Sequence, residues 1–116
     1  MKLNQQNGTL SVTGLRELNA ANAQAFRSTL ARALSHDLQA IEIDLSQTKI
    51  VDGAGLGALV SLFEAANGHR NRKGFAMRLI NPTPTVQQMI ELARLHHLFE
   101  IIPAGSTPDG ARLQAT

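Results

Sequence analysis

The sequence predicts a single α/β domain with a mixed, mostly parallel β-sheet and about three helices, and three observations support it. Short runs that alternate apolar and polar residues, typical of half-buried strands, recur along the chain. Longer segments with apolar residues at helical spacing lie between them. Strands joined through helices of this length pair in parallel, because a parallel connection must cross the sheet. The expected order is β-β-α-β-α-β-α-β.

The expected elements of the first half begin with a hairpin. Asn7-Gly8 separates two short strands and favours a tight turn, because both residues tolerate positive φ. Asn19 and Asn22 are candidate N-caps of the first helix. The segment "AIEIDLS" alternates aliphatic and acidic residues, which predicts the next strand. These elements are strands near 1–5 and 8–13, a helix over about 20–35 and a strand at 40–46.

The second half continues the same alternation. A helix over 54–67 is expected to end at Asn67-Gly68, because both residues readily adopt the left-handed backbone conformation that terminates helices. Thr83 is the expected N-cap of the third helix, and Pro84 stands at the first helical position, where its missing N–H costs nothing. These elements are the helix over 54–67 with Leu56, Leu59, Val60 and Phe63 on one face, a strand at 75–81, a helix over 83–98 and a strand at 99–102.

Composition limits the domain organisation and the class of partner. The 116 residues suit one domain, expected over 1–102, followed by a loose tail over 103–116 that is rich in Pro, Gly and Ser. A net charge of +2 and only four aromatic residues predict no nucleic-acid partner. The chain has no cysteine, no signal-peptide pattern and no membrane-span pattern, so we expect a cytoplasmic protein.

The glycine-rich stretch "DGAGLGA" at 52–58 has two candidate uses. Residues 53–58 match the dinucleotide fingerprint G-x-G-x-x-G/A, and a helix N-terminus could hold a nucleotide or another anion. Seven residues separate Leu45 from Gly53, however, and no carboxylate follows the next strand, so the context argues against a dinucleotide. A Walker-type loop is excluded because no Gly-Lys-Ser/Thr occurs.

The same stretch also fits a turn that presents a helix to another protein. Asp52 stands just ahead of the helix, where a carboxylate can accept backbone N–H groups. Small side chains on one side of the helix would let a partner approach closely, although alanine is also simply a good helix former. These small residues are Ala54, Gly57, Ala58, Ser61 and Ala65.

Other candidate sites are weak. The basic segment 69–73, together with Arg78, could meet an acidic partner but is typical of a solvated loop. His96 and His97 are adjacent, so they point about 100° apart on a helix and make a poor chelate for a metal. No serine lies in a nucleophile turn, and Glu42 and Asp44 fit the polar side of a strand. The sequence therefore predicts neither an enzyme nor a cofactor or metal site.

Several motifs in order resemble the STAS domain, the fold of bacterial anti-sigma-factor antagonists. A strand ending in Asp-Leu leads to an Asp-x-x-Gly-Leu-x-x-Leu turn, a further strand, a Pro-x-Val helix and a Leu-x-x-Leu-Phe-x-Ile close. The resemblance covers roughly 8–102 and implies a non-catalytic protein that binds a kinase-like anti-sigma factor. It also implies a binding surface over the turn and helix at 52–61, which comprises Asp52, Gly53, Ala54, Gly55, Gly57, Ala58 and Ser61.

The resemblance further implies a phosphorylation switch whose acceptor this chain lacks. The family's Ser or Thr directly after the motif's Asp corresponds to Gly53, and the next position is Ala54, so neither residue has a hydroxyl. The same turn is compatible with the STAS subunit that braces the ATPase of a bacterial lipid ABC transporter. Arg94 replaces the family's helix-ending glycine, which predicts a slightly longer third helix.

Overall fold

The computed structural model describes residues 1–35, 37–68 and 76–103. This part contains a five-stranded sheet of order β1-β2-β4-β6-β7 and a separate pair that joins β3 to β5. The predicted class, a mostly parallel α/β sheet with three helices, is confirmed. The elements are β1 Lys2–Gln6, β2 Thr9–Thr13, β3 Glu17–Leu18, α1 Ala23–Ala33, β4 Ala40–Asp44, β5 Ile50–Val51, α2 Gly53–Gly68, β6 Ala76–Ile80, α3 Pro84–Leu92 and β7 Glu100–Ile102.

The sheet has one antiparallel pair and three parallel pairs. β1 and β2 form the predicted hairpin, in which Asn7 and Gly8 have φ values of 53° and 80°. Positive φ at both central residues is what a type I′ turn requires. The pairs β2–β4, β4–β6 and β6–β7 are all parallel. Because each connection steps one strand along the sheet in the same direction, right-handed crossovers place the helices on one face.

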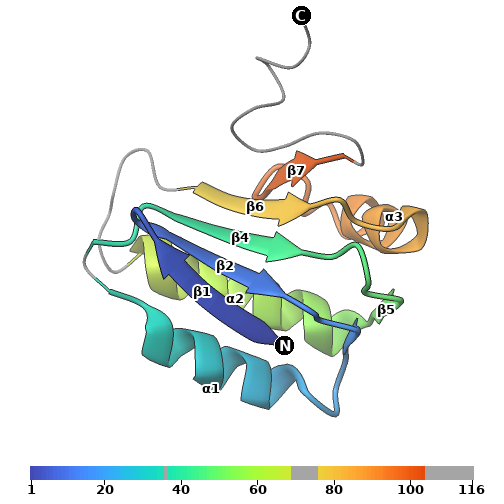
Figure 1. Ribbon diagram of the computed structural model, residues 1–116. Coiled ribbons are helices and arrows are strands. Elements are labelled where there is room, and N and C mark those ends of the chain that lie inside the picture. Colours follow the sequence, from blue (N-terminus) through green and yellow to red (C-terminus); the bar gives the residue numbers. More distant parts are fainter. Residues whose placement is uncertain (36, 69–75, 104–116) are drawn as a thin grey trace, which may run out of the picture.

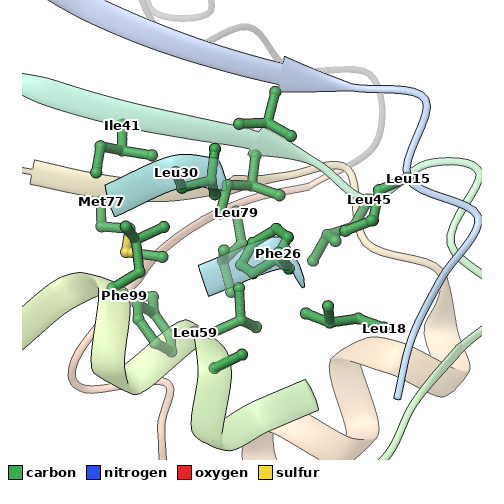
Figure 2. Close-up of a cluster of buried hydrophobic side chains, with 14 of the residues drawn as sticks. Leu15, Leu18, Phe26, Leu30, Ile41, Leu45, Leu59, Met77, Leu79 and Phe99 are labelled. Atoms are coloured by element: carbon green, nitrogen blue, oxygen red, sulfur yellow. The ribbon is translucent and has the colours of Figure 1, made fainter. Parts of the chain in front are cut away.

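The core lies between that face and the helices, and Figure 1 shows α1 and α2 side by side beneath the sheet. Alternate residues of the central strands, such as Ile41 and Leu79, point into it and are fully buried. Figure 2 shows how Phe26 and Leu30 of α1 meet these strand residues. Phe63 and Phe99 make an edge-to-face contact, at 6.2 Å between ring centroids.

The core-facing side of α2 differs from the predicted one. Of the four predicted residues only Leu59 is fully buried, whereas Leu56, Val60 and Phe63 are half-buried and pack at the margin of the core. The innermost positions are taken by Gly55, Ala58, Leu59, Leu62 and Ala66. α1 also packs against α2, so a second neighbour besides the sheet decides which positions of the helix are buried. Apolar periodicity alone does not report that neighbour.

Two short strands were not predicted. β3 and β5 have two residues each and pair in parallel, with Glu17 opposite Ile50 and Leu18 opposite Val51. The sequence suggested only a connection here, because two residues carry no readable alternation. This pair matters for function because β5 leads directly into α2.

The third helix ends at Leu92, so the predicted longer helix is wrong. Arg94 itself adopts the left-handed conformation, with φ 61°. Its N–H donates to the carbonyl of Glu91 at 2.9 Å, and the Leu95 N–H donates to that of Ile90 at 3.0 Å. These two bonds form a Schellman motif, which glycine usually closes. The surrounding structure thus imposes on an arginine the conformation that the family's glycine adopts freely.

Arg94→Gly is therefore expected to stabilise the domain by about 0.5–1 kcal/mol. Relief of the left-handed strain outweighs the greater chain entropy that glycine gives to the unfolded state. Chemical denaturation followed by circular dichroism would measure the change. Arg94→Ala is the matched control, because it removes the same side chain but keeps the Cβ that strains the backbone. An equal gain in both variants would contradict the strain argument.

Two sequence predictions lie outside the described residues. The tail over 103–116 is described only at Pro103, which is exposed. The basic segment 69–73 lies wholly between β6 and the last described residue of α2. The helix α2 does end at Gly68, in agreement with the Asn67-Gly68 signal.

Candidate partner-binding site

Asp52 fixes the turn that leads from β5 into α2. Its carboxylate Oδ1 accepts the Gly55 N–H at 2.9 Å, and its backbone carbonyl accepts the Leu56 N–H at 2.9 Å. The first bond is that of a helix N-cap, and the negative charge complements the helix dipole. The other carboxylate oxygen, Oδ2, accepts the Ala20 N–H at 3.2 Å. Asp52 therefore holds the start of α2 against the loop that precedes α1.

Gly55 brings the first turn of α2 into contact with β3. A Cβ at this position would lie 2.1 Å from the carbonyl oxygen of Leu18 and 2.8 Å from its carbon. No side chain fits there, because the obstructing atoms belong to the backbone. The Leu18 carbonyl also accepts the Asp52 N–H at 3.1 Å. Leu18 therefore contacts the turn both at Asp52, before the helix, and at Gly55, in its first turn.

The exposed part of this turn is small and apolar. Gly53, Ala54 and Gly57 are all exposed. A Cβ at Gly53 or Gly57 would meet nothing within 4 Å. These three residues, here called the open face, leave the backbone of the first helical turns accessible to another molecule. They lie on a helix whose start is held by Asp52 and Gly55, so the open face is preformed.

The predicted set of small residues divides between this surface and the core. Ala58 is fully buried and Gly55 is buried, so both belong to the packing of α2 rather than to an exposed surface. Ser61 and Ala65 are half-buried. By helical geometry Ala58, Ser61 and Ala65 lie away from the side of Phe63, which contacts Phe99. The small residues therefore do not form one exposed surface, because only Ala54 and Gly57 among them are exposed.

The same geometry disfavours an anion at this helix N-terminus. The Gly55 and Leu56 N–H groups already donate to Asp52, and its carboxylate adds negative charge beside the turn. Nothing in the arrangement supports the alternative of a nucleotide held by these amides.

Arg78, which the sequence grouped with the basic segment, lies in an ion-paired row on the other face of the sheet. Its guanidinium contacts Glu42 at 3.0 Å and Glu100 at 2.7 Å. Burial lowers the pKa of Arg78, but the hydrogen bonds and charges of Glu100 and Glu42 outweigh this effect, so its pKa is raised overall. Strand register brings the three residues together across β4, β6 and β7. Arg78 is therefore engaged within the sheet.

The remaining candidates have no support as metal or catalytic sites. The rings of His96 and His97 lie 4.1 Å apart, both exposed. No group of three or more potential metal ligands occurs in the described ranges. The Asp44 carboxylate accepts the Ser46 N–H at 2.8 Å, which closes a local turn. No helix of the described chain is long and apolar enough to cross a membrane.

One feature that the sequence did not indicate is a hollow at the carboxyl end of β4. It has a volume of about 390 Å³ and is lined by Arg16, Ser46, Gln47, Lys49 and Thr83. Arg16 and Lys49 are far apart in the sequence, and only the pairing of β3 with β5 places them side by side. No motif in the sequence signals this arrangement.

Several solved structures have the same fold as this chain, and three of them are described as anti-sigma factor antagonists. One is a putative anti-sigma factor antagonist from Thermotoga maritima, with a TM-score of 0.79 and 19% identity over 97% of this chain and 92% of that chain. An anti-sigma factor antagonist from Mycobacterium paratuberculosis has a TM-score of 0.76 and 21% identity over 97% and 90%. A third is the unphosphorylated form of the anti-sigma factor antagonist SpoIIAA, a Bacillus cell fate determinant. It has a TM-score of 0.68 and 16% identity over 98% of this chain and 96% of that chain.

SpoIIAA in its phosphorylated form also has this fold, with a TM-score of 0.64 and 16% identity over 99% of this chain and 98% of that chain.

The family assignment comes from the sequence as a whole. Among curated proteins, none matches this chain significantly. The family model for the STAS domain matches residues 1–107, which is most of the 116-residue chain. The chain belongs to the STAS domain family.

Proposed function

We propose that this protein is a non-catalytic regulatory domain of the cytoplasm that binds a kinase-like anti-sigma factor through the start of α2. The observation that carries the proposal is the open face of Gly53, Ala54 and Gly57, which is exposed on a rigidly capped helix. The STAS fold shared with anti-sigma factor antagonists supports a regulatory protein-binding role. A partner that docks here meets an accessible backbone. Little side-chain conformational entropy is lost on binding, because this surface has no long side chain that must be ordered.

We further propose that phosphorylation at this turn does not release the partner. SpoIIAA is known in phosphorylated and unphosphorylated forms. In this chain the position after Asp52 is Gly53 and the next is Ala54, and neither side chain has an oxygen to accept phosphate. A phosphate beside Asp52 would add about −1.5 to −2 charges to a contact surface. Without that charge the open face keeps its binding-competent form.

The docking test uses Gly57→Arg, which blocks the open face without unfolding the helix. The substitution enters open space and replaces glycine by a better helix former, so the domain should remain folded. In affinity capture from native lysate, wild type should retain a kinase-like anti-sigma factor, identified by mass spectrometry. Gly57→Arg should bind this factor at least about tenfold more weakly in a direct titration, a loss of about 1.4 kcal/mol.

The matched control is Ala31→Arg, at an exposed position near the end of α1. It adds the same charge and side chain away from the open face, so it should bind as wild type does. Equal binding by all three proteins would show that the open face is not the interface. Circular dichroism of each variant would verify that the fold is retained.

The switch is tested with the captured kinase and ATP. Wild type should take up no phosphate at residue 53 and should stay bound. Gly53→Ser restores a hydroxyl at an exposed position with free space around its Cβ, and it should be phosphorylated and released. Release of wild type under the same conditions would contradict the proposal that the switch is absent.

The transporter alternative has no observation in its favour. The solved structures named above are anti-sigma factor antagonists, and none of them is a transporter subunit. The capture experiment also distinguishes the two, because a transporter ATPase in place of a kinase-like factor would reverse this choice of partner.

A further inference from the structure

Two cations stand side by side in the hollow at the end of β4. The Arg16 carbonyl accepts the Lys49 N–H at 2.9 Å, one step before the paired residues Glu17 and Ile50. Residues opposite each other in a parallel pair direct their side chains to the same face, and both of these line the hollow. Neither cation makes an ion pair within the described ranges, where the recorded pairs belong to Arg78. Like charges placed opposite each other are destabilising unless an anion lies between them.

Uncharged donors surround the same hollow. Ser46 contributes a hydroxyl group and Gln47 an amide, whereas the Thr83 hydroxyl is already engaged, since it donates to the Thr48 carbonyl at 3.4 Å. Thr83 is also the N-cap of α3, where its hydroxyl accepts the Val86 N–H at 3.3 Å, so the positive end of that helix dipole faces the hollow. Acidic groups nearby are Glu17, Glu91 and Asp44, and the Asp44 carboxylate is turned toward the Ser46 N–H. The charged residues that line the hollow itself, Arg16 and Lys49, are both cations, which favours a small anion between them.

A second hollow adjoins the first and shares Ser46 and Thr83 with it. It has a volume of about 530 Å³ and runs along α3. Its other lining residues include the amides Asn81, Gln87 and Gln88, together with two prolines. Side-chain amides both donate and accept hydrogen bonds, so they suit a ligand portion that carries hydroxyl groups. Glu91 at its end accepts hydrogen bonds and disfavours a second anionic group.

We infer that these hollows bind a small phosphomonoester, with its phosphate between Arg16 and Lys49 and its hydroxyl-bearing part along α3. Arginine and lysine both recognise phosphate through charge-assisted hydrogen bonds, and the adjoining hollow has room for a sugar-sized group. The inference is independent of the proposed docking function, because none of the three open-face residues lines either hollow.

The test is a titration of the isotopically labelled full chain with ribose 5-phosphate at low ionic strength, followed by amide chemical shifts. Inorganic phosphate and ribose are titrated in parallel, with ionic strength matched by sodium chloride. Ribose 5-phosphate should bind saturably, with shifts centred on Ser46, Gln47 and Lys49. Inorganic phosphate should bind at least about threefold more weakly, and ribose should not bind.

Arg16→Gln/Lys49→Gln should weaken ribose 5-phosphate binding at least about tenfold, because both charged partners of the phosphate are lost. Arg27→Gln/Arg32→Gln on α1 makes the same change in net charge elsewhere and should bind as wild type does. Thermal unfolding would verify that both double variants fold. Equal affinity in all three proteins would show an adventitious ion only, and the absence of saturable binding would overturn the site. Equal binding of phosphate and ribose 5-phosphate would overturn the assignment of the adjoining hollow.

Discussion

Gly55→Ala is expected to lower the free energy of unfolding by about 3 kcal/mol. The added Cβ would lie 2.1 Å from the Leu18 carbonyl oxygen, a distance that no side-chain rotation relieves. Either α2 must move away from β3 or β3 must separate from β5, and both changes disturb the fully buried Leu18 and Val51. Urea denaturation followed by circular dichroism would measure the loss.

Gly57→Ala is the matched control, two residues further along the same helix. Its Cβ would meet nothing within 4 Å, so only helix propensity changes and the domain should gain about 0.5–1 kcal/mol. The two substitutions are chemically identical, and they should differ in sign. A gain at both positions would show that the close approach of α2 to β3 does not exist in solution.

Asp52→Ala is expected to cost about 2 kcal/mol of stability. The substitution removes the acceptor for the Gly55 N–H and the acceptor for the Ala20 N–H, and it removes a negative charge at the positive end of the α2 dipole. Denaturant titration of the purified variant would measure the loss, and hydrogen exchange at Gly55 and Ala20 should accelerate with it.

Asp52→Asn separates the contributions of charge and hydrogen bonding. Its side-chain oxygen can still accept the Gly55 N–H, whereas its amide nitrogen cannot accept the Ala20 N–H. We expect a loss of about half that of Asp52→Ala. If Asp52→Ala were as stable as wild type, the carboxylate would be a surface group available to a partner, and the structural role argued above would be wrong.

Ala58 and Asp52 are unsuitable positions for testing the docking surface. Ala58→Glu would place a charge in the core, since Ala58 is fully buried, and Asp52→Arg would remove the helix cap. Loss of binding in either variant would follow from unfolding alone. Gly57→Arg avoids this ambiguity because the position is exposed and the change favours the helix. The open face is therefore best tested at Gly57.

Local patterns in the sequence were enough to predict the class of fold and the order of its main elements. The alternation in "AIEIDLS", the Asn7-Gly8 turn and the Thr83-Pro84 helix start each act over a few neighbouring residues, and the structure has all three features. Thr83 caps α3 through the predicted side-chain bond to Val86. Such signals are readable because the responsible interactions are local in the chain.

Which residues of the candidate site are exposed depends on packing between distant parts of the chain. Gly55 and Gly57 look alike in the sequence, yet the Leu18 carbonyl blocks one and nothing contacts the other. Ala58 is buried by the packing of α2. Arg16 and Lys49 meet only through the pairing of β3 with β5. Each outcome depends on contacts between residues distant in the sequence, and local propensity carries no information about those contacts.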